Sequence, residues 1–299
     1  MSILVVGSVA YDSVETPFGK VTNAIGGSAL YFSSAAHFFS PVKIVAVVGK
    51  DFEFDKINFL KEKNVDFDGL LIEEGKTFRW GGRYHPEMNL RDTLYTELNV
   101  FENFNPIIPE HYKSSKYIFL ANIDPDLQLN VLDQVNNPEL IVLDTMNFWI
   151  TGKSKSLEDV IKRVDMIILN DEEICQLTEL SHLHEAALFL FEMGPKALIV
   201  KRGEYGSILI TRENYFFAPG YPIKKVTDPT GAGDSFAGGF LGYLASVGNF
   251  SDENLRKALV YGTVLASYNI ENFSFDALRN LNRDDIERRF NRIREMTRF

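Results

Sequence analysis

Short apolar runs alternate along the chain with longer stretches in which apolar residues recur at helical spacing. The runs predict buried strands of a parallel sheet, and each intervening stretch is long enough for a helix. The predicted strands are Ile3–Val6, Val42–Val48, Tyr117–Leu120, Leu140–Leu143, Met166–Leu169 and Ala197–Val200. The predicted helices are Ser28–Phe39, Asp126–Val135, Leu157–Arg163, the Ala186–Met193 region, Leu255–Ile270 and Arg283–Arg298. This order predicts an α/β fold: a mostly parallel sheet flanked by helices, with right-handed crossovers.

Two segments interrupt this order with alternation of period two. Residues 13–25 alternate around a Pro-x-Gly turn, and residues 76–100 place Phe78, Trp80 and Tyr84 at even spacing. Such alternation is typical of half-exposed strands. We therefore expect one small inserted β-sheet, a lid above the main sheet, within a single domain that spans the whole chain. The alternative is a pair of edge hairpins without a role in the site.

Charge and composition exclude several classes of protein. The 299 residues carry a formal net charge of −10, which disfavours a broad nucleic-acid-binding face. The single cysteine, Cys175, excludes an internal disulfide and is expected to fill space on a helix. His182 and His184, expected on a strand, lack the acidic partners of a zinc site. The N-terminus does not resemble a signal peptide, and no apolar run approaches the roughly 20 residues of a membrane span, so we expect a cytoplasmic protein.

The segment Asp228-Pro-Thr-Gly-Ala-Gly-Asp234 is the most informative part of the chain. Gly231, Ala232 and Gly233 precede a helix of small and apolar residues, so their N–H groups are expected at a helix start, where donors are unpaired and the dipole is positive. These are properties of an anion site. A carboxylate in the same turn would repel an anion, unless Asp234 takes a proton from a hydroxyl that attacks a bound phosphate. The alternative is a glycine-rich turn with a capping aspartate.

On these residues the chain resembles the PfkB family of carbohydrate kinases, whose fold is ribokinase-like. The family signature D-T-x-G-A-G-D-x-F is similar to Asp228–Phe236, although Pro229 replaces the common threonine. Other similar positions, in the family's order, are Asp12, Gly26-Gly27, Gly49-Lys50-Asp51, Asn170-Asp171-Glu172-Glu173 and Gly203-Glu204-Tyr205-Gly206. The family also has a lid sheet inserted at the two places where the alternating segments lie.

The resemblance implies a role for each matched residue. Asp234 would be the general base, and Gly231, Ala232 and Gly233 the anion hole for the migrating phosphoryl group. ATP would be bound by Asn170, Glu173, Gly203, Gly206, Gly231 and Gly233, with Glu173 acting on Mg²⁺ through water. The acceptor would be bound by Asp12, Gly26, Gly27, Tyr31 and Asp234.

The chain departs from the ribokinase branch at positions that concern the acceptor. Tyr31 stands where that branch has asparagine, Ser28 stands where it has lysine, and Asp144–Trp149 lacks the arginine of the usual D-x-N-x-R. Tyr31 follows Gly27 by four residues, so it can share a helix face with it. We expect Tyr31 to line the acceptor pocket and free ribose to be a poor substrate. The alternative is that Tyr31 points into the core.

The resemblance implies an ATP-dependent, Mg²⁺-dependent kinase that phosphorylates a hydroxyl, usually a primary CH₂OH, of a sugar, polyol or nucleoside. The alternative is a non-catalytic ribokinase-like protein that binds or senses a nucleoside or sugar, which the presence of Asp234, Asn170 and Glu173 disfavours. A nicotinamide-dependent oxidoreductase is excluded, because the segment after the first strand lacks G-x-G-x-x-G.

Two further expectations concern assembly and a monovalent cation. Related kinases often pair lid to lid, and an aromatic lid face needs cover, so a C2 homodimer is expected. In the ribokinase branch the residue matching Asp228 lies beside a K⁺ site that a later loop completes, here near residues 267–274. That loop is poor in glycine. Whether Asp228 helps to bind K⁺ or only braces the turn is left open.

Overall fold

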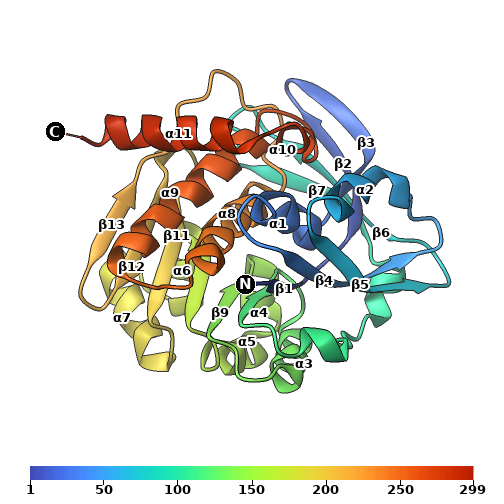
Figure 1. The fold of residues 1–299 in the computed structure, drawn as a ribbon, viewed down its shortest axis with the longest axis horizontal. Helices are drawn as coiled ribbons and strands as arrows, with labels where there is room; N and C mark the ends of the chain where they lie inside the picture. Colours follow the sequence, from blue (N-terminus) through green and yellow to red (C-terminus); the bar gives the residue numbers. More distant parts are fainter. Residues whose placement is uncertain (299) are drawn as a thin grey trace.

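A nine-stranded sheet forms the centre of the molecule in the computed structural model, which describes residues 1–298 (Figure 1). Its strands, in spatial order, are β13 (Tyr215–Ala218), β12 (Ser207–Thr211), β11 (Ala197–Lys201), β10 (Met166–Asn170), β9 (Leu140–Asp144), β8 (Tyr117–Leu120), β1 (Ile3–Val6), β4 (Val42–Gly49) and β5 (Val65–Glu73). The strands from β11 to β5 are parallel, and β12 and β13 add an antiparallel edge. The predicted fold class is therefore confirmed.

Helices cover both faces of this sheet because its strands are apolar on both sides. In β1, Ile3 and Val5 belong to one hydrophobic cluster, and Leu4 and Val6 belong to the other. The helices against the first cluster are α1 (Ser28–Ala36), α2 (Asn58–Lys61), α8 (Ala232–Val247), α9 (Asp252–Asn269), α10 (Asp276–Arg279) and α11 (Arg283–Met296). Those against the second are α3 (Pro125–Gln134), α4 (Asn147–Gly152), α5 (Ser154–Ile161), α6 (Asp171–Thr178) and α7 (Leu183–Met193). Short 3₁₀ turns occur at Phe54–Ile57, Asn99–Asn103, Glu110–Tyr112 and Gly203–Tyr205.

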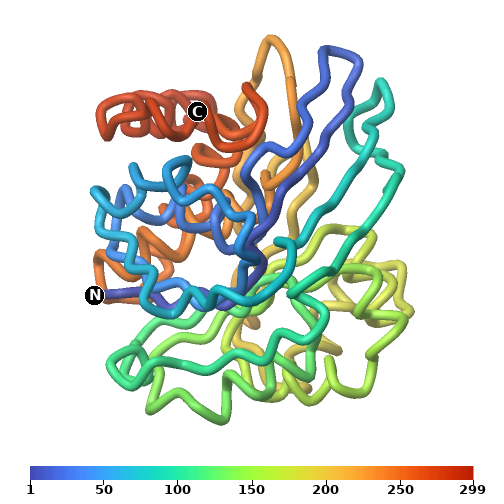
Figure 2. Tube along the Cα trace, turned by 90° about the vertical axis from the view of Figure 1, so that its right-hand side faces the viewer, coloured from blue at the N-terminus to red at the C-terminus, as the bar shows by residue number. Residues whose placement is uncertain are grey.

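The two alternating segments form a second, four-stranded sheet, which we call the lid sheet. Its order is β3 (Gly19–Gly26), β2 (Ala10–Thr16), β6 (Phe78–Tyr84) and β7 (Arg91–Glu97). The two hairpins pair through β2 and β6, which run parallel to each other. Figure 2 shows them, in blue and cyan, rising side by side from the body of the molecule.

The structure contains three strands that were not predicted, as well as the short helices α2, α4 and α10, and it places one pair of histidines differently. Strands β5, β12 and β13 were not predicted; in β5 only Val65 and Gly69 are buried, unlike the residues of the continuous apolar runs. The prediction that His182 and His184 lie on a strand is wrong, because His182 precedes α7 and His184 lies in its first turn. Cys175 lies on α6 as expected. In the part of the chain that the structure describes, no helix is both long and apolar enough to cross a membrane.

Candidate active site

Polar side chains end three neighbouring strands of the main sheet at the same edge. Asp144 ends β9, Asn170 ends β10 and Lys201 ends β11, each after a buried apolar run. Asn170 and Lys201 are direct neighbours in the strand register. In open α/β sheets, ligands bind outside the carboxyl ends of the strands. The start of α8, with Asp234 in its first turn, lies at the same edge, where Asp144 and Lys201 act electrostatically on Asp234.

The turn before α8 provides free backbone donors at a helix start, as predicted. Gly231 adopts a left-handed conformation (φ 73°) and precedes the helix without a side-chain cap. The Ala232 N–H donates to the Pro229 carbonyl at 3.1 Å. Within residues 1–298, the N–H groups of Gly231 and Gly233 have no backbone acceptor, whereas the Asp234 N–H acts on its own carboxylate. The Gly231 and Gly233 donors are therefore available to an anion, and the Ala232 amide is already engaged.

Asp234 is surrounded by charged groups that set its proton affinity. Burial and the nearby Asp144 carboxylate raise its pKa to about 7, against the opposing effects of Lys201 and Arg91. A carboxyl group with a pKa near 7 is suited to accept a proton at physiological pH. The side chain keeps partial contact with solvent, as a group that must meet a substrate requires.

Asp12, on β2 of the lid sheet, lies deep in the same site. It is 5% exposed. Burial, reinforced by the charges of Asp228 and Asp234, raises the pKa of Asp12 to about 7. A Cβ atom at Gly26 would lie 2.0 Å from Asp12 Oδ2, so only glycine at this position leaves room for the carboxylate. Asp12 is thus a buried hydrogen-bonding group that faces the other two acids.

Tyr31 lies between this acceptor region and the anion turn. Its ring packs against Gly231, where a Cβ atom would come within 2.2 Å of the ring carbons, and meets Phe275 edge-on at 5.9 Å between ring centroids. Its hydroxyl group acts on the Asp12 carboxyl group, but forms no hydrogen bond of regular geometry. Tyr31 is almost fully buried. Its ring is therefore part of the core, while its hydroxyl end adjoins the predicted acceptor site.

The Gly26-Gly27 pair connects β3 to α1, and Gly27 packs against the loop that follows β1. Gly27 has a φ of 96°, and a Cβ atom there would lie 2.5 Å from the Ser8 carbonyl oxygen. Ser8 and Ser28 are linked reciprocally, each backbone N–H donating to the other's hydroxyl oxygen at 3.0 Å. Ser28, the residue that departs from the ribokinase branch, thus holds the helix start in place.

Asn170 and Glu173 form a reciprocal cap at the start of α6. The Glu173 N–H donates to Asn170 Oδ1 at 2.7 Å, and the Asn170 N–H donates to Glu173 Oε2 at 2.8 Å. This arrangement explains the N-x-x-E pattern locally as a capping box. It also fixes a buried carboxylate at the sheet edge. Glu173 Oε1 has no hydrogen-bond partner in the described part of the chain, so it is free to bind a water molecule of a hydrated cation.

The Gly203–Gly206 turn follows β11 and lies under the tip of the lid hairpin. Both glycines have positive φ values, 53° and 93°. A Cβ atom at Gly206 would lie 2.0 Å from the Ala218 carbonyl oxygen, so the tight turn requires glycine. On the other side, Gly203 faces Asn89 of the lid, whose Oδ1 would be 3.3 Å from a Cβ atom. The lid hairpin therefore reaches from Asp12 to this turn.

The lid sheet presents one polar and aromatic face to the site. Trp80 is in register with Asp12 on the neighbouring strand, so the two side chains share a face. Farther along that strand, the Thr230 hydroxyl and the Tyr84 hydroxyl are hydrogen bonded at 3.2 Å. Arg91, in register with Tyr84, places its guanidinium 5.5 Å from the Trp80 ring centroid.

Asp144, Lys201 and Arg91 are site residues that sequence reasoning missed as functional groups. Lys201 Nζ lies 3.3 Å from Asp144 Oδ1. Arg91 acts on both Asp234 and Glu173. A signal for the first two was present, because each is a polar residue that ends a buried strand at the ligand-binding edge. Arg91 had no such signal, since it begins a fully exposed strand.

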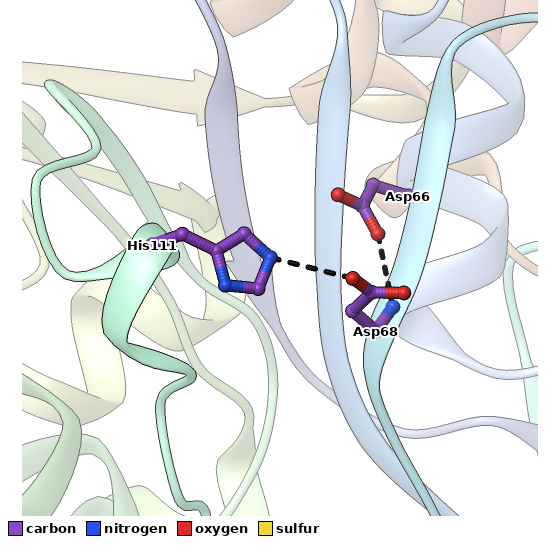
Figure 3. Close-up of side chains that lie close together, drawn as sticks. All are labelled: Asp66, Asp68 and His111. Atoms are coloured by element: carbon purple, nitrogen blue, oxygen red, sulfur yellow. Dashed lines mark hydrogen bonds and ion pairs between the residues drawn. The ribbon is translucent and has the colours of Figure 1, made fainter.

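A separate group of possible metal ligands lies elsewhere. Asp66, Asp68 and His111 bring one ligand atom each within 4.8 Å of the others (Figure 3). Asp66 and Asp68 are at the start of β5, at the opposite end of the strands from Asp144 and Lys201. Asp66 Oδ1 already accepts the Asp68 N–H at 2.9 Å, and Asp68 pairs with His111 at 3.4 Å. These contacts join β5 to the Glu110–Tyr112 turn, and they include no residue of the candidate active site.

Comparison with known proteins identifies a family and relatives that this chain resembles. Residues 126–277 match the model of the pfkB family carbohydrate kinases. The cytidine kinase of Thermococcus kodakarensis is 30% identical over 251 residues, covering 81% of this chain and 87% of its own. The nucleoside kinase of Methanocaldococcus jannaschii is 28% identical over 225 residues, covering 74% and 66%.

Solved structures share the fold over nearly the whole chain. A putative ribokinase II from E. coli, in its apo form, has a TM-score of 0.83 at 19% identity and covers 97% of this chain and 99% of its own. The Methanocaldococcus jannaschii nucleoside kinase has a TM-score of 0.76 at 22% identity, covering 97% and 98%. The family model matches half of this chain, and the cytidine kinase is similar over most of this chain. The chain therefore belongs to the pfkB family of carbohydrate kinases and is a phosphotransferase with a sugar or nucleoside alcohol as acceptor.

Proposed function

We propose that the protein transfers the γ-phosphoryl group of ATP to the primary hydroxyl of a nucleoside. The observation that carries this proposal is the placement of two carboxyl groups, Asp12 and Asp234, within electrostatic reach of each other, beside an aromatic lid face and a free helix start. The names of the two similar curated relatives, a cytidine kinase and a nucleoside kinase, support the acceptor class. A cytoplasmic location, where ATP is available, completes the proposal.

In this mechanism Asp234 takes the proton of the attacking hydroxyl. The new bond forms between the acceptor oxygen and the γ-phosphorus, and the bond from that phosphorus to the ADP oxygen breaks. The N–H groups of Gly231 and Gly233 donate to the transferred phosphoryl oxygens. Positioning and electrostatic stabilisation contribute most of the rate in such reactions.

The nucleotide is held by the turns at the sheet edge. Gly203 and Gly206 shape the turn that receives it, and Asn170 fixes the Glu173 carboxylate. Mg²⁺, which keeps several water ligands when it binds phosphates, would be held there by Glu173 through water and would neutralise phosphate charge. The buried Glu173 carboxylate with one unpartnered oxygen fits that role.

The acceptor is recognised on the face of the lid sheet that carries Asp12 and Trp80. Asp12 accepts hydrogen bonds from sugar hydroxyls, and Gly26 and Gly27 let the backbone approach them closely. Trp80, which shares a lid face with Asp12 and is only half-buried, offers a ring on which a nucleobase can stack. Tyr31 closes the inner end of the pocket. A free sugar has no base that could stack on the Trp80 ring.

An acceptor screen tests the proposed function directly. Purified protein with ATP and Mg²⁺ should consume ATP with cytidine or another nucleoside at a kcat/KM at least about tenfold above that with ribose, fructose or a polyol, because one stacked base contributes about 1–3 kcal/mol. Phosphorus–proton coupling in the NMR spectrum of the product should locate the phosphate on the CH₂OH carbon. A free sugar as the best acceptor would contradict the nucleoside assignment.

Asp228 is proposed to brace the anion turn rather than to bind K⁺. Its Oδ1 accepts the Thr230 N–H at 2.9 Å, its Oδ2 accepts the Ser274 N–H at 3.4 Å, and the Ile270 carbonyl accepts two N–H groups from the same turn. These oxygens are therefore already engaged. The best acceptor should be phosphorylated at equal rates in K⁺, Na⁺ and tetramethylammonium buffers. Activation specific to K⁺ would show that the loop binds the ion.

The lid edge supports a homodimer. All seven residues of β7 are exposed, Leu94 and Tyr95 among them, and β7 is an edge strand with unpaired backbone groups. We expect sedimentation equilibrium at micromolar concentration to give twice the 34.0 kDa chain mass. Leu94→Glu should give a monomer, whereas Leu188→Glu, at an exposed leucine of α7, should leave the dimer intact. A monomeric wild-type protein would rule this interface out.

A further inference from the structure

Lys201 occupies an unusual place for a lysine. Lysine side chains are rarely withdrawn from solvent unless they are paired, yet the Lys201 side chain is only 21% exposed, and its partner Asp144 is 9% exposed. The lysine ends β11 directly beside Asn170 of β10. Its ammonium group is therefore held at the sheet edge where the proposed phosphoryl transfer takes place.

The ammonium group of Lys201 lies against the first turn of α8. A Cβ atom at Gly233 would be 2.9 Å from Lys201 Nζ, so the glycine allows the close approach. A cation beside a helix N-terminus is electrostatically unfavourable, because the N-terminus is the positive end of the helix dipole. Helix stability therefore does not account for this contact. An anion bound between the ammonium group and the free N–H groups would be stabilised by both.

Three carboxylates keep Lys201 charged in this position. Burial alone lowers the pKa of a lysine, but the charges of Asp144, Glu173 and Asp234 outweigh it and hold the pKa of Lys201 above its usual value. Asp144 makes the direct contact, and the other two act at longer range. The Lys201 ammonium group is thus a permanent positive charge in the site, in addition to the base and the backbone donors of the proposed phosphoryl transfer.

We propose that Lys201 is a catalytic residue that donates a hydrogen bond to a non-bridging oxygen of the transferred phosphoryl group, and that Asp144 is a positioning residue that holds it. Lys201 neither gains nor loses a proton during transfer. As the bond from the acceptor oxygen to phosphorus forms and the bond to the ADP oxygen breaks, the ammonium group offsets the negative charge on the oxygens. This inference rests on the proposed function, since it needs a phosphoryl group at the anion turn.

Lys201→Met should lower kcat by about 10²–10³-fold, the loss seen when one preorganised donor to a developing anion is removed. The dissociation constant of ADP should stay within a few-fold of wild type. Lys201→Arg should recover part of the rate because it restores the positive charge. Lys196→Met, which removes an exposed lysine at the other end of the same strand region, should leave kcat unchanged.

Two measurements distinguish a catalytic role of Lys201 from a purely structural ion pair with Asp144. Loss of the Lys201 charge removes an effect that lowers the pKa of Asp234, so the rise of kcat/KM with pH should move to higher pH in Lys201→Met. Calorimetry should show weaker binding of ADP with aluminium fluoride, a mimic of the transferred group, at unchanged ADP affinity. The second readout needs no acceptor, so it tests Lys201 even where the screen finds no phosphorylated nucleoside. Unchanged affinity for ADP–aluminium fluoride, or a kcat within threefold of wild type, would overturn the proposal.

Discussion

Asp234→Asn should reduce kcat by about 10²–10⁴-fold, the usual contribution of a positioned general base, while ATP still binds with near-normal affinity. Asparagine has the same shape as aspartate but cannot take the proton of the attacking hydroxyl. The matched control is Asp284→Asn, which removes an exposed aspartate from the first turn of α11 and should leave turnover unchanged. Steady-state rates and nucleotide titrations on both variants check this, and full activity of Asp234→Asn would refute the assignment of the base.

The pH dependence of kcat/KM for the wild-type enzyme should also identify Asp234 as the base. The base must be ionised to act, and the pKa of Asp234 is raised to about 7, so kcat/KM should rise with pH and reach half its maximum near pH 7. Burial also raises the pKa of Asp144, whose charge is the largest electrostatic effect on Asp234. The observed midpoint therefore belongs to the coupled pair rather than to one residue. The Asp234→Asn variant should lose this rise along with its activity.

Stability measurements distinguish loss of the base from loss of the fold. A carboxyl group whose pKa is raised on folding stabilises the folded protein only at low pH, below its ordinary value near 4, and that stabilisation is lost as pH rises through about 7. At pH 8 the wild-type protein thus holds an unfavourable charge that asparagine removes. Asp234→Asn should therefore unfold at the same temperature as wild type or higher at pH 8. A lowered melting temperature would mean that the activity loss reports damage to the fold.

The sequence predicts the main architecture well because the main sheet is buried on both faces. Each continuous apolar run, such as Ile3–Val6, has no other stable arrangement than a covered strand, and the apolar periodicity between runs specifies the helices. Strand β5 escaped prediction because it lies at the sheet edge, where exposed positions break the apolar run. The prediction is thus strongest where burial dictates residue type.

The site is only partly predictable for a different reason. Local features depend on residues adjacent in sequence: the helix start at Gly231 was predicted from its segment, and Asn170 and Glu173 were matched through the family motif, although their role as a cap was not predicted. The contact between Asp144 and Lys201 joins residues 57 positions apart, and Arg91 reaches the site from the lid sheet. Such contacts depend on strand order and on how the lid folds back. Spacing along the chain does not encode them, so only the assembled fold reveals them.

Tyr31 should determine which acceptor the enzyme prefers. Its ring fills the space against Gly231 and Phe275, and its hydroxyl end adjoins Asp12. A rigid ring at this place narrows the pocket where the ribokinase branch has a smaller amide. We expect free ribose to be phosphorylated with a kcat/KM about 10²-fold or more below that of the best nucleoside, because an acceptor that leaves buried polar groups unpaired is strongly rejected.

Two substitutions at Tyr31 separate its hydroxyl group from its ring. Tyr31→Phe removes only the hydroxyl and should lower acceptor kcat/KM by about tenfold, the effect of losing one proposed hydrogen bond to the acceptor of about 1.4 kcal/mol, without changing the KM for ATP. Tyr31→Asn opens the pocket and should narrow the gap between ribose and the best nucleoside. Because loss of a buried ring costs about 3–5 kcal/mol of stability, Tyr117→Asn, at a buried tyrosine of β8, is the control: it should be destabilised without changing the acceptor ranking. If ribose is the best acceptor of the wild-type enzyme, or if Tyr31→Asn leaves the ranking unchanged, Tyr31 belongs to the core alone and its ring does not select the acceptor.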